Sequence, residues 1–147
     1  MGRYKEYLRL STEGVLNSYA QVFFSQNRYF GLFLLLVTMF NFPAGLSGLL
    51  AILIVQAMAW FFNFNRDLVR DGTYTYNAML TGVAVGSFYQ YNVSFIILLV
   101  SSSVLSFLFT LWYLNSLGKK NLPVLTIPFL MSVWVLLLGS SNFTALQ

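Results

Sequence analysis

The chain has 147 residues, of which 58% are hydrophobic and only 8% are charged. Soluble domains carry about 25% charged residues, so a monomer of this composition cannot be dispersed in water. The sequence contains no cysteine and no histidine. This excludes disulfide scaffolds, thiolate or imidazole metal sites and catalytic triads with a histidine base. We therefore expect no metal, no cofactor and no enzymatic activity.

The charged residues occur in small groups that separate three uncharged stretches, 29–65, 72–118 and 121–147. Each stretch is longer than the about 20 residues that a helix needs to cross a membrane. The net charge is +4, and the basic residues lie at the ends of apolar stretches. This pattern predicts orientation in a lipid bilayer, not binding to nucleic acid.

The first two segments of the chain are more polar than the rest. Residues 1–14 contain Arg3, Lys5, Glu6, Arg9 and Glu13. They lack the pattern of a signal peptide, and we expect a cytoplasmic N-terminal segment. Residues 15–27 mix apolar and amide side chains, and a helix of this length measures about 20 Å, less than the hydrocarbon core of about 30 Å. Such an element either lies at the membrane surface or enters the membrane and returns.

The number of membrane spans depends on residues 29–62, which are too long for one untilted span. Pro43 disfavours helix before it, so a break there would give two spans. With the break, all 8 basic residues fall on the side of the N-terminus, whereas without it they divide equally between the two sides. The positive-inside rule favours the break. Within a single membrane domain, 15–147, we therefore predict five spans, 29–42, 43–62, 73–90, 92–117 and 121–139, with the N-terminus cytoplasmic and the C-terminus outside.

The third predicted span begins with a polar and aromatic pattern. At helical spacing Tyr76 and Leu80 share one face, and Asn77 lies on the adjacent face. An amide is costly in lipid, so Asn77 should face protein or a water-filled path.

Small residues in the spans have a structural interpretation. We expect the glycines to allow close helix packing and the serines to make hydrogen bonds between helices. The glycine positions are Gly45, Gly48, Gly82 and Gly86, with Ser47 beside them; the serines are Ser101, Ser102, Ser103 and Ser106.

The fifth predicted span contains Pro123 and Pro128. Pro123 suits a first helical turn, but Pro128 is expected inside the helix. There it would leave the carbonyl of Val124 unpaired next to the hydroxyl of Thr126. The segment therefore predicts oxygen acceptors at membrane depth, although a kink satisfied by packing is equally compatible with it.

Three segments of the chain together resemble the urea transporter family: Gln21–Val22–Phe23–Phe24–Ser25–Gln26–Asn27, Tyr76–Asn77–Ala78–Met79–Leu80–Thr81–Gly82 and Leu122–Pro123–Val124–Leu125–Thr126–Ile127–Pro128–Phe129. Their order and spacing fit along nearly the whole chain. The chain departs from the family pattern at Arg28–Tyr29, where asparagine and proline are common, at Ala78 for glycine and at Tyr76 for phenylalanine. These changes affect fine selectivity.

The resemblance implies an all-α membrane protein with five transmembrane helices and a short re-entrant pore helix over 15–27. It implies one half of an inverted-repeat channel, similar to the family's first half, assembled as a homotrimer in the cell (inner) membrane. Gln21 would begin the pore helix, with Phe23 beside it, and Asn77 would brace the third span. The walls of a narrow slot would be Val22, Phe24, Tyr76 and Leu80, and the oxygen acceptors would come from Thr126 and the carbonyl of Val124.

The implied function is facilitated diffusion of urea through half a pore, completed by a covalent continuation or by another chain. Two alternatives remain: a channel for another small neutral solute such as ammonia, water or short amides, and a non-transporting membrane anchor or assembly subunit. A membrane enzyme would need an acid or base at the interface, but Asp67 and Asp71 with Arg66 and Arg70 are typical of a solvated, salt-bridged turn.

Overall fold

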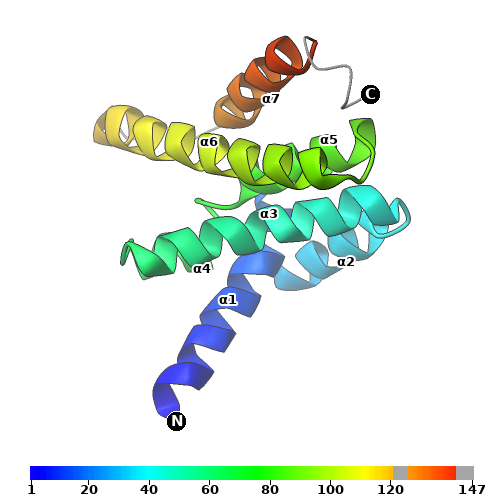
Figure 1. Cartoon of the computed structure of the whole chain (residues 1–147). Coiled ribbons are helices and arrows are strands. Elements are labelled where there is room, and N and C mark those ends of the chain that lie inside the picture. Colours follow the sequence, from blue (N-terminus) through cyan, green and yellow to red (C-terminus); the bar gives the residue numbers. More distant parts are fainter. Residues whose placement is uncertain (121–125, 142–147) are drawn as a thin grey trace.

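The computed structural model describes residues 1–120 and 126–141, and all regular elements within these ranges are helical (Figure 1). The all-α class predicted from the sequence is thereby confirmed. In chain order the helices are α1 (Gly2–Gln21), α2 (Arg28–Thr38), α3 (Phe42–Phe61), α4 (Arg66–Arg70), α5 (Tyr76–Phe88), α6 (Val93–Leu117), the short 3₁₀ helix η1 (Gly118–Lys120) and α7 (Ile127–Ser140).

Helices α2, α3, α5, α6 and α7 follow the five predicted spans in order. The break expected near Pro43 is present, because α2 ends at Thr38 and Pro43 lies in the first turn of α3, where its missing N–H costs no hydrogen bond. Two helical segments, Phe42–Phe61 and Val93–Lys120, are long and apolar enough to cross a membrane. Arg28–Thr38 and Ile127–Ser140 are apolar but shorter, so that five crossings stay a prediction.

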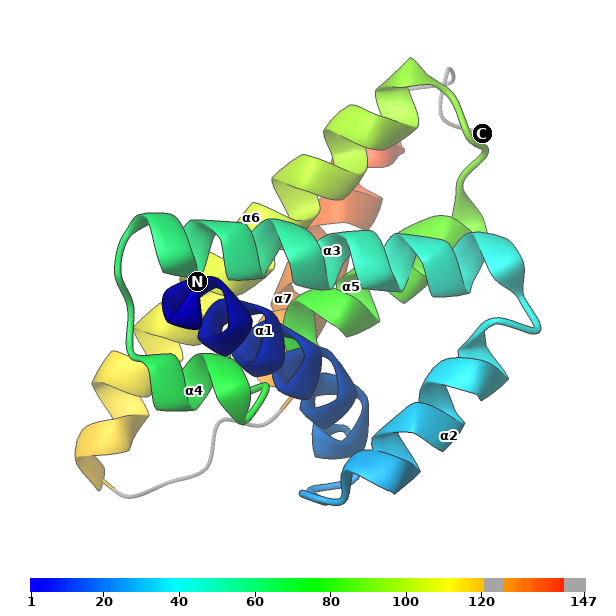
Figure 2. The ribbon, with the colours of Figure 1, turned by 90° about the horizontal axis from the view of Figure 1, so that it is seen from below.

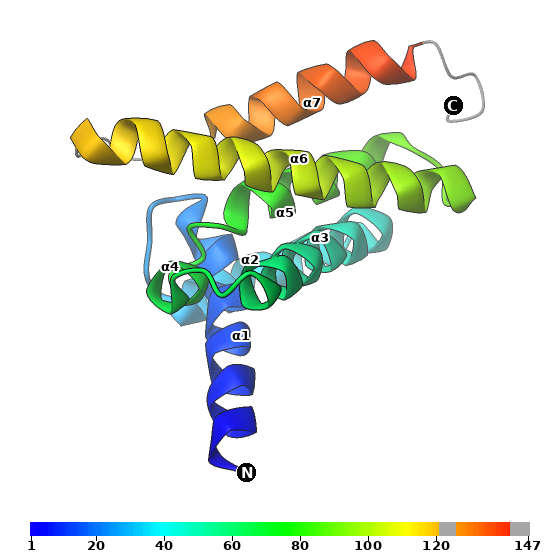
Figure 3. The ribbon, with the colours of Figure 1, turned by 60° about the vertical axis from the view of Figure 1, so that its left-hand side comes forward.

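The N-terminal region differs from the two expected segments. Helix α1 runs without interruption from Gly2 to Gln21, across the expected boundary at residue 14. Its sequence contains no proline, and an ion pair of Arg9 with Glu13, four residues apart, stabilises the helix at that boundary. The N-terminal end of α1 projects beyond the other helices (Figures 1 and 3).

Asparagine side chains begin three of the helices. The side-chain oxygen of Asn27 accepts a hydrogen bond from the backbone N–H of Tyr29 at the start of α2. Asn65 and Asn92 make the same kind of contact at the starts of α4 and α6. Each cap satisfies one of the backbone donors that a helix start leaves without a partner, and so fixes where the helix begins.

Helices α3 and α5 lie side by side (Figure 2). Small residues at their contact let the two backbones approach closely, as the sequence predicts. A Cβ atom added to Gly82 would lie 2.5 Å from the carbonyl oxygen of Ser47, and one on Gly86 would lie 2.5 Å from the Ser47 hydroxyl. A Cβ on Gly48 would lie 2.7 Å from Val83. Only glycine leaves room for this approach.

The serines of α6 do not join helices as predicted. The hydroxyls of Ser102 and Ser103 both donate to the backbone carbonyl of Leu99, at 3.0 and 2.7 Å, and Ser101 donates to Leu98 at 3.1 Å. A hydroxyl in an apolar helix has a carbonyl one turn earlier within reach. The prediction of interhelical bonds is therefore wrong for these three residues.

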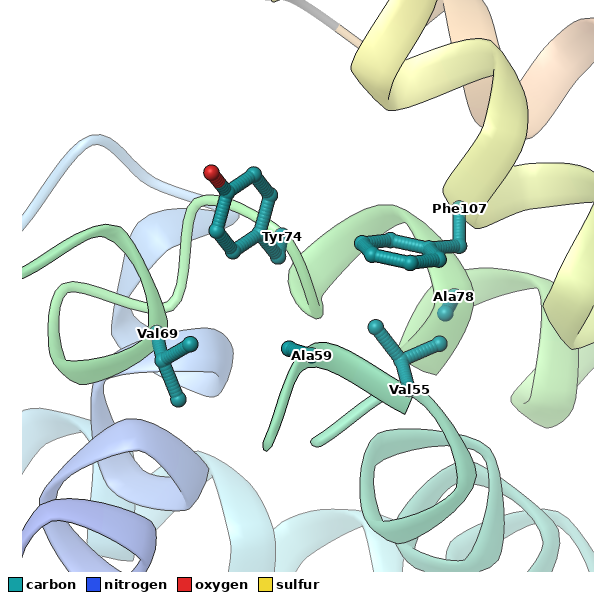
Figure 4. Close-up of a cluster of buried hydrophobic side chains, with 6 residues drawn as sticks. All are labelled: Val55, Ala59, Val69, Tyr74, Ala78 and Phe107. Atoms are coloured by element: carbon teal, nitrogen blue, oxygen red, sulfur yellow. The ribbon is translucent and has the colours of Figure 1, made fainter. Parts of the chain in front are cut away.

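A buried cluster holds the start of α5 against its neighbours (Figure 4). The ring of Tyr74 meets the ring of Phe107 from α6 edge-on, with centroids 5.7 Å apart. Aromatic pairs in this geometry gain about 0.5–1.5 kcal/mol beyond their buried area. The cluster comprises Val55 and Ala59 of α3, Val69 of α4, Tyr74, Ala78 of α5 and Phe107.

Candidate functional site

The end of α1 is joined to the segment that leads into α5, more than fifty residues later in the chain. The hydroxyls of Ser18 and Thr75 are hydrogen-bonded, and the side-chain amide of Asn17 donates to the carbonyl of Arg70 at 2.7 Å. Gly72 has φ +76°, and a Cβ there would lie 2.6 Å from the backbone nitrogen of Ser18. These contacts lie just before the first two segments of the family resemblance and hold the chain together at the points where those segments begin.

Two of the predicted slot residues pack against the same apolar cluster. Val22, just after α1, and Leu80 of α5 both contact the buried group formed by Tyr19, Ile52 and Met79. The cluster fixes the end of α1 relative to the first turns of α5.

The two phenylalanines after α1 lie on the surface of the chain. Phe23 and Phe24 are 62% and 65% exposed, while Gln21 at the end of α1 is partly buried. The ring of Phe23 packs edge-on against Phe30 of α2, with centroids 5.7 Å apart. Phe24 has φ +56°, a left-handed conformation that side chains other than glycine adopt only when the surroundings impose it.

Tyr76 and Asn77 lie inside the chain, at 2% and 0% exposure. The expectation that Asn77 faces protein is confirmed. The hydroxyl of Thr81 donates to the backbone carbonyl of Asn77 at 2.9 Å, within the first turns of α5. The ring of Tyr76 is covered by protein within this chain.

The start of α7 differs from the expected kinked helix. Thr126 precedes the first helical residue, Ile127, so Pro128 lies in the first turn and not in the helix interior. A first turn tolerates proline because its N–H needs no partner there. The Thr126 carbonyl accepts from the backbone N–H of Leu130 at 3.1 Å. Val124, whose carbonyl was the second expected acceptor, lies outside the described residues.

Helices α5 and α7 end at a shared contact. The hydroxyl of Tyr89, the residue after α5, lies 2.6 Å from that of Ser140 at the end of α7. Leu136 of α7 also packs in one buried cluster with Val85 of α5. Since the C-terminal ends of two similarly long helices meet, Thr126 lies toward the end of the molecule at which α5 begins.

A buried carboxylate close to these residues was missed by sequence reasoning. Glu13 of α1, with its side chain 7% exposed, contacts three arginines from three helices. Its Oε1 accepts from Arg9 Nε at 2.9 Å and from Arg28 Nη1 at 2.9 Å, and its Oε2 accepts from Arg70 Nε at 2.7 Å. We call this group the Glu13 cluster.

The Glu13 cluster keeps its carboxylate ionised. Burial alone would raise the pKa of Glu13, but hydrogen bonds from Arg9 and Arg70 and the charge of Arg28 outweigh it and hold that pKa below its ordinary value. The only sequence signal for this site was an acid four residues after Arg9. Arg28 and Arg70 are too distant in sequence to be assigned to it without coordinates.

The four charged residues of the segment 66–71 are exposed, as predicted, but the salt bridges expected within the turn are not among the described ion pairs. Among the described ion pairs, Arg70 binds Glu13, and Arg66 lies 3.7 Å from Glu6, so both arginines pair with α1. The turn itself is the short helix α4, which begins at the Asn65 cap.

Three grooves in the described part of the chain lie away from the predicted site residues. One of 520 Å³ runs between α6 and α7, and one of 510 Å³ lies between Leu16 and the start of α2. The third, of 410 Å³, lies between α1 and the end of α3. None of these three contains a residue of the predicted slot.

A family model described as urea transporter matches residues 12–147. The match extends from the middle of α1 to the end of the chain and includes every residue of the predicted slot. Its description is that of a transporter of a small neutral solute and not of an enzyme, and the two long apolar helical segments agree with a membrane protein. The chain thus belongs to the urea transporter family.

Proposed function

We propose that this chain forms one side of a passive urea channel, built from the end of α1, the start of α5 and the start of α7. One observation carries the proposal. The Ser18–Thr75 hydrogen bond lies just before two segments that resemble the family's pore motifs, and Val22 and Leu80, one from each of these segments, pack on the same apolar cluster.

The chemistry of urea fits such a slot. Urea is flat and uncharged, and its entry into hydrocarbon costs several hydrogen bonds to water. A row of oxygen acceptors, with Thr126 as one of them, would replace those bonds. Apolar walls at Val22, Phe24 and Leu80 would admit a planar molecule and offer no counter-charge to a hydrated ion. Tyr76 is 2% exposed, so in this chain its ring lies beneath the proposed wall surface and not on it. The predicted spans carry no charged residue, which argues against coupling to protons or sodium through an intramembrane carboxylate.

We further propose that the chain supplies half of the pore. Each pore motif occurs once in the sequence, whereas inverted-repeat transporters carry two copies. Phe23 and Phe24 are exposed on this chain, so a slot bounded by Phe24 needs a second wall from elsewhere. Five spans place a following half in the opposite orientation. A covalent continuation is favoured over an antiparallel copy, because all basic residues fall on one predicted side.

Urea flux in proteoliposomes, measured by stopped-flow light scattering on the chain together with the sequence or second chain that completes the pore, tests the proposal. Phe24→Ala should change urea flux with little effect on folding, because the ring is already exposed. Phe40→Ala is the matched control, since Phe40 is 93% exposed and lies between α2 and α3. Equal urea flux in both variants and in the unchanged protein would contradict the assignment of Phe24 to the slot.

A second pair of variants tests the oxygen acceptor. Thr126→Val should lower urea flux by about fivefold, because one hydrogen bond contributes about 1 kcal/mol and that energy corresponds to a factor of about five. Thr110→Val is the control, because the Thr110 hydroxyl is buried and bonds its own helix at Ser106. If the unchanged protein gives no urea flux above that of empty liposomes and Thr126→Val impairs assembly, the result supports the membrane-anchor alternative.

A further inference from the structure

The first half of α1 is an amphipathic helix with cations on both borders of its apolar face. At helical spacing Tyr4, Tyr7, Leu8 and Ser11 lie within an arc of about 100°. Arg3 and Lys5 lie on either side of that arc, and Glu6 lies roughly opposite to it. Tyr4 and Leu8 are 79% and 67% exposed, so the fold of this chain leaves much of the apolar face uncovered.

This half of α1 lies where a membrane-length helix ends. The ring of Tyr7 packs edge-on against Trp60, one residue before the end of α3, with centroids 4.8 Å apart. The side-chain amide of Gln56 in α3 donates to the backbone carbonyl of Ser11 at 3.1 Å. Beyond this crossing the N-terminal end of α1 extends away from α3, and the two helix axes lie at a steep angle to each other (Figures 1 and 3). Because α3 is long enough to cross a membrane, its end marks the level of the membrane surface.

A groove of 410 Å³ separates the two helices at this level. Its walls are aromatic and aliphatic on the α1 side and end at Trp60 and Asn63 on the α3 side. Tryptophan and tyrosine are the side chains typical of a membrane–water interface. The lining residues are Tyr4, Tyr7, Leu8, Ser11, Trp60 and Asn63.

A cation borders the groove. The guanidinium carbon of Arg66 lies 5.6 Å from the centre of the Tyr7 ring and 6.0 Å from that of Trp60. Its acidic neighbour is Glu6, at 3.7 Å, and both side chains are about half exposed. Around the apolar groove the three positive charges of Arg3, Lys5 and Arg66 face the one negative charge of Glu6, which leaves a surplus of two positive charges.

We infer that the first half of α1 lies in the plane of the membrane surface and that its groove with α3 binds an anionic phospholipid. An acyl chain would lie along Leu8 and the rings of Tyr4 and Trp60, with the phosphate toward Arg3 and Arg66 on one border of the apolar face and Lys5 on the other border. A helix that is apolar on one face and bordered by cations binds in this orientation, because the long basic side chains extend from the apolar level to the headgroups. The surplus charge selects an anionic headgroup over a zwitterionic one.

Tryptophan fluorescence of the full chain in liposomes tests this inference. Trp112→Phe with Trp134→Phe leaves Trp60 as the single tryptophan, and both replaced rings are more than half exposed. Phosphatidylglycerol and phosphatidylcholine with brominated acyl chains are then compared as quenchers at equal mole fraction. We expect brominated phosphatidylglycerol to quench Trp60 more strongly.

Neutral variants separate a specific site from general attraction. Arg3→Gln and Lys5→Gln should each lower the preference for phosphatidylglycerol by about fivefold, which corresponds to about 1 kcal/mol per cation at an anionic surface. The matched control is Lys119→Gln with Lys120→Gln, at the end of α6, which should leave quenching of Trp60 unchanged. Circular dichroism verifies that each variant remains helical.

Three results would overturn the inference: equal quenching by the two lipids, a preference that persists in the Arg3→Gln, Lys5→Gln double variant, or one that the control pair abolishes. A last experiment adds soluble glycerol phosphate as a competitor of the brominated lipid. If it displaces the brominated lipid at similar concentration, the site binds free phosphate and not a lipid. Urea flux, measured on the same liposomes, keeps this outcome separate from that of the proposed function.

Discussion

Glu13→Gln should destabilise the fold by about 3 kcal/mol. The substitution keeps the shape of the side chain but removes the negative charge that three arginines share. Those arginine side chains are 44% to 75% exposed, so each pair belongs near the top of the 0.2–1 kcal/mol range of exposed pairs, about 1 kcal/mol, and not in the 3–5 kcal/mol range of fully buried pairs. Three such pairs act on one buried carboxylate.

The free energy of unfolding in mixed micelles, followed by tryptophan fluorescence over a denaturant series, measures this change. Glu6→Gln is the matched control. Glu6 lies 3.7 Å from a single arginine and both side chains are about half exposed, so the loss should be below about 0.5 kcal/mol. If the two variants lose the same stability, the Glu13 cluster does not tie α1, α2 and α4 together, and the reasoning from its burial is refuted.

Two further outcomes follow from the described geometry. Because the pKa of Glu13 is lower in the folded chain than its ordinary value of 4.5, its contribution to stability is complete above about pH 4.5 and is lost as the pH falls through the folded-state pKa. Denaturant midpoints measured from neutral to acidic pH should show this loss in the unchanged protein, and the loss should be smaller in Glu13→Gln. Gly82→Ala should destabilise by about 1–3 kcal/mol, because its Cβ would meet the Ser47 carbonyl oxygen at 2.5 Å. Gly139→Ala, also in a helix but with open space around it, should not destabilise in the same unfolding assay, because alanine favours the helix.

The order and approximate limits of the helices could be predicted from the sequence because the signals are local. Long uncharged stretches indicate apolar helices. Proline is favoured in the first turn of a helix, so Pro43 indicates a helix start. The close contact at Gly82 was predictable for the same reason, since small residues in an apolar helix indicate a near neighbour.

The features that were missed depend on contacts between distant residues. Nothing near Glu13 in sequence indicates Arg28 or Arg70, and the pairing of Arg66 and Arg70 with α1 depends on how α4 packs against that helix. For Pro128, either of two helix starts fits the local sequence, and the choice of Ile127 follows from the fold. The slot itself stays a prediction, because the second wall that we propose for it is not part of this chain.

The contact of α3 with α5 has a mechanical consequence. Where Gly82 and Gly86 lie against α3, only small side chains such as that of Ser47 lie between the two backbones. A shift of one helix along the other by a single residue, about 1.5 Å, would drive Val83 or Thr81 into the position that a hydrogen atom now fills. Helices α3 and α5 therefore form a rigid unit, and we expect any hinge motion in the elements that pack around them.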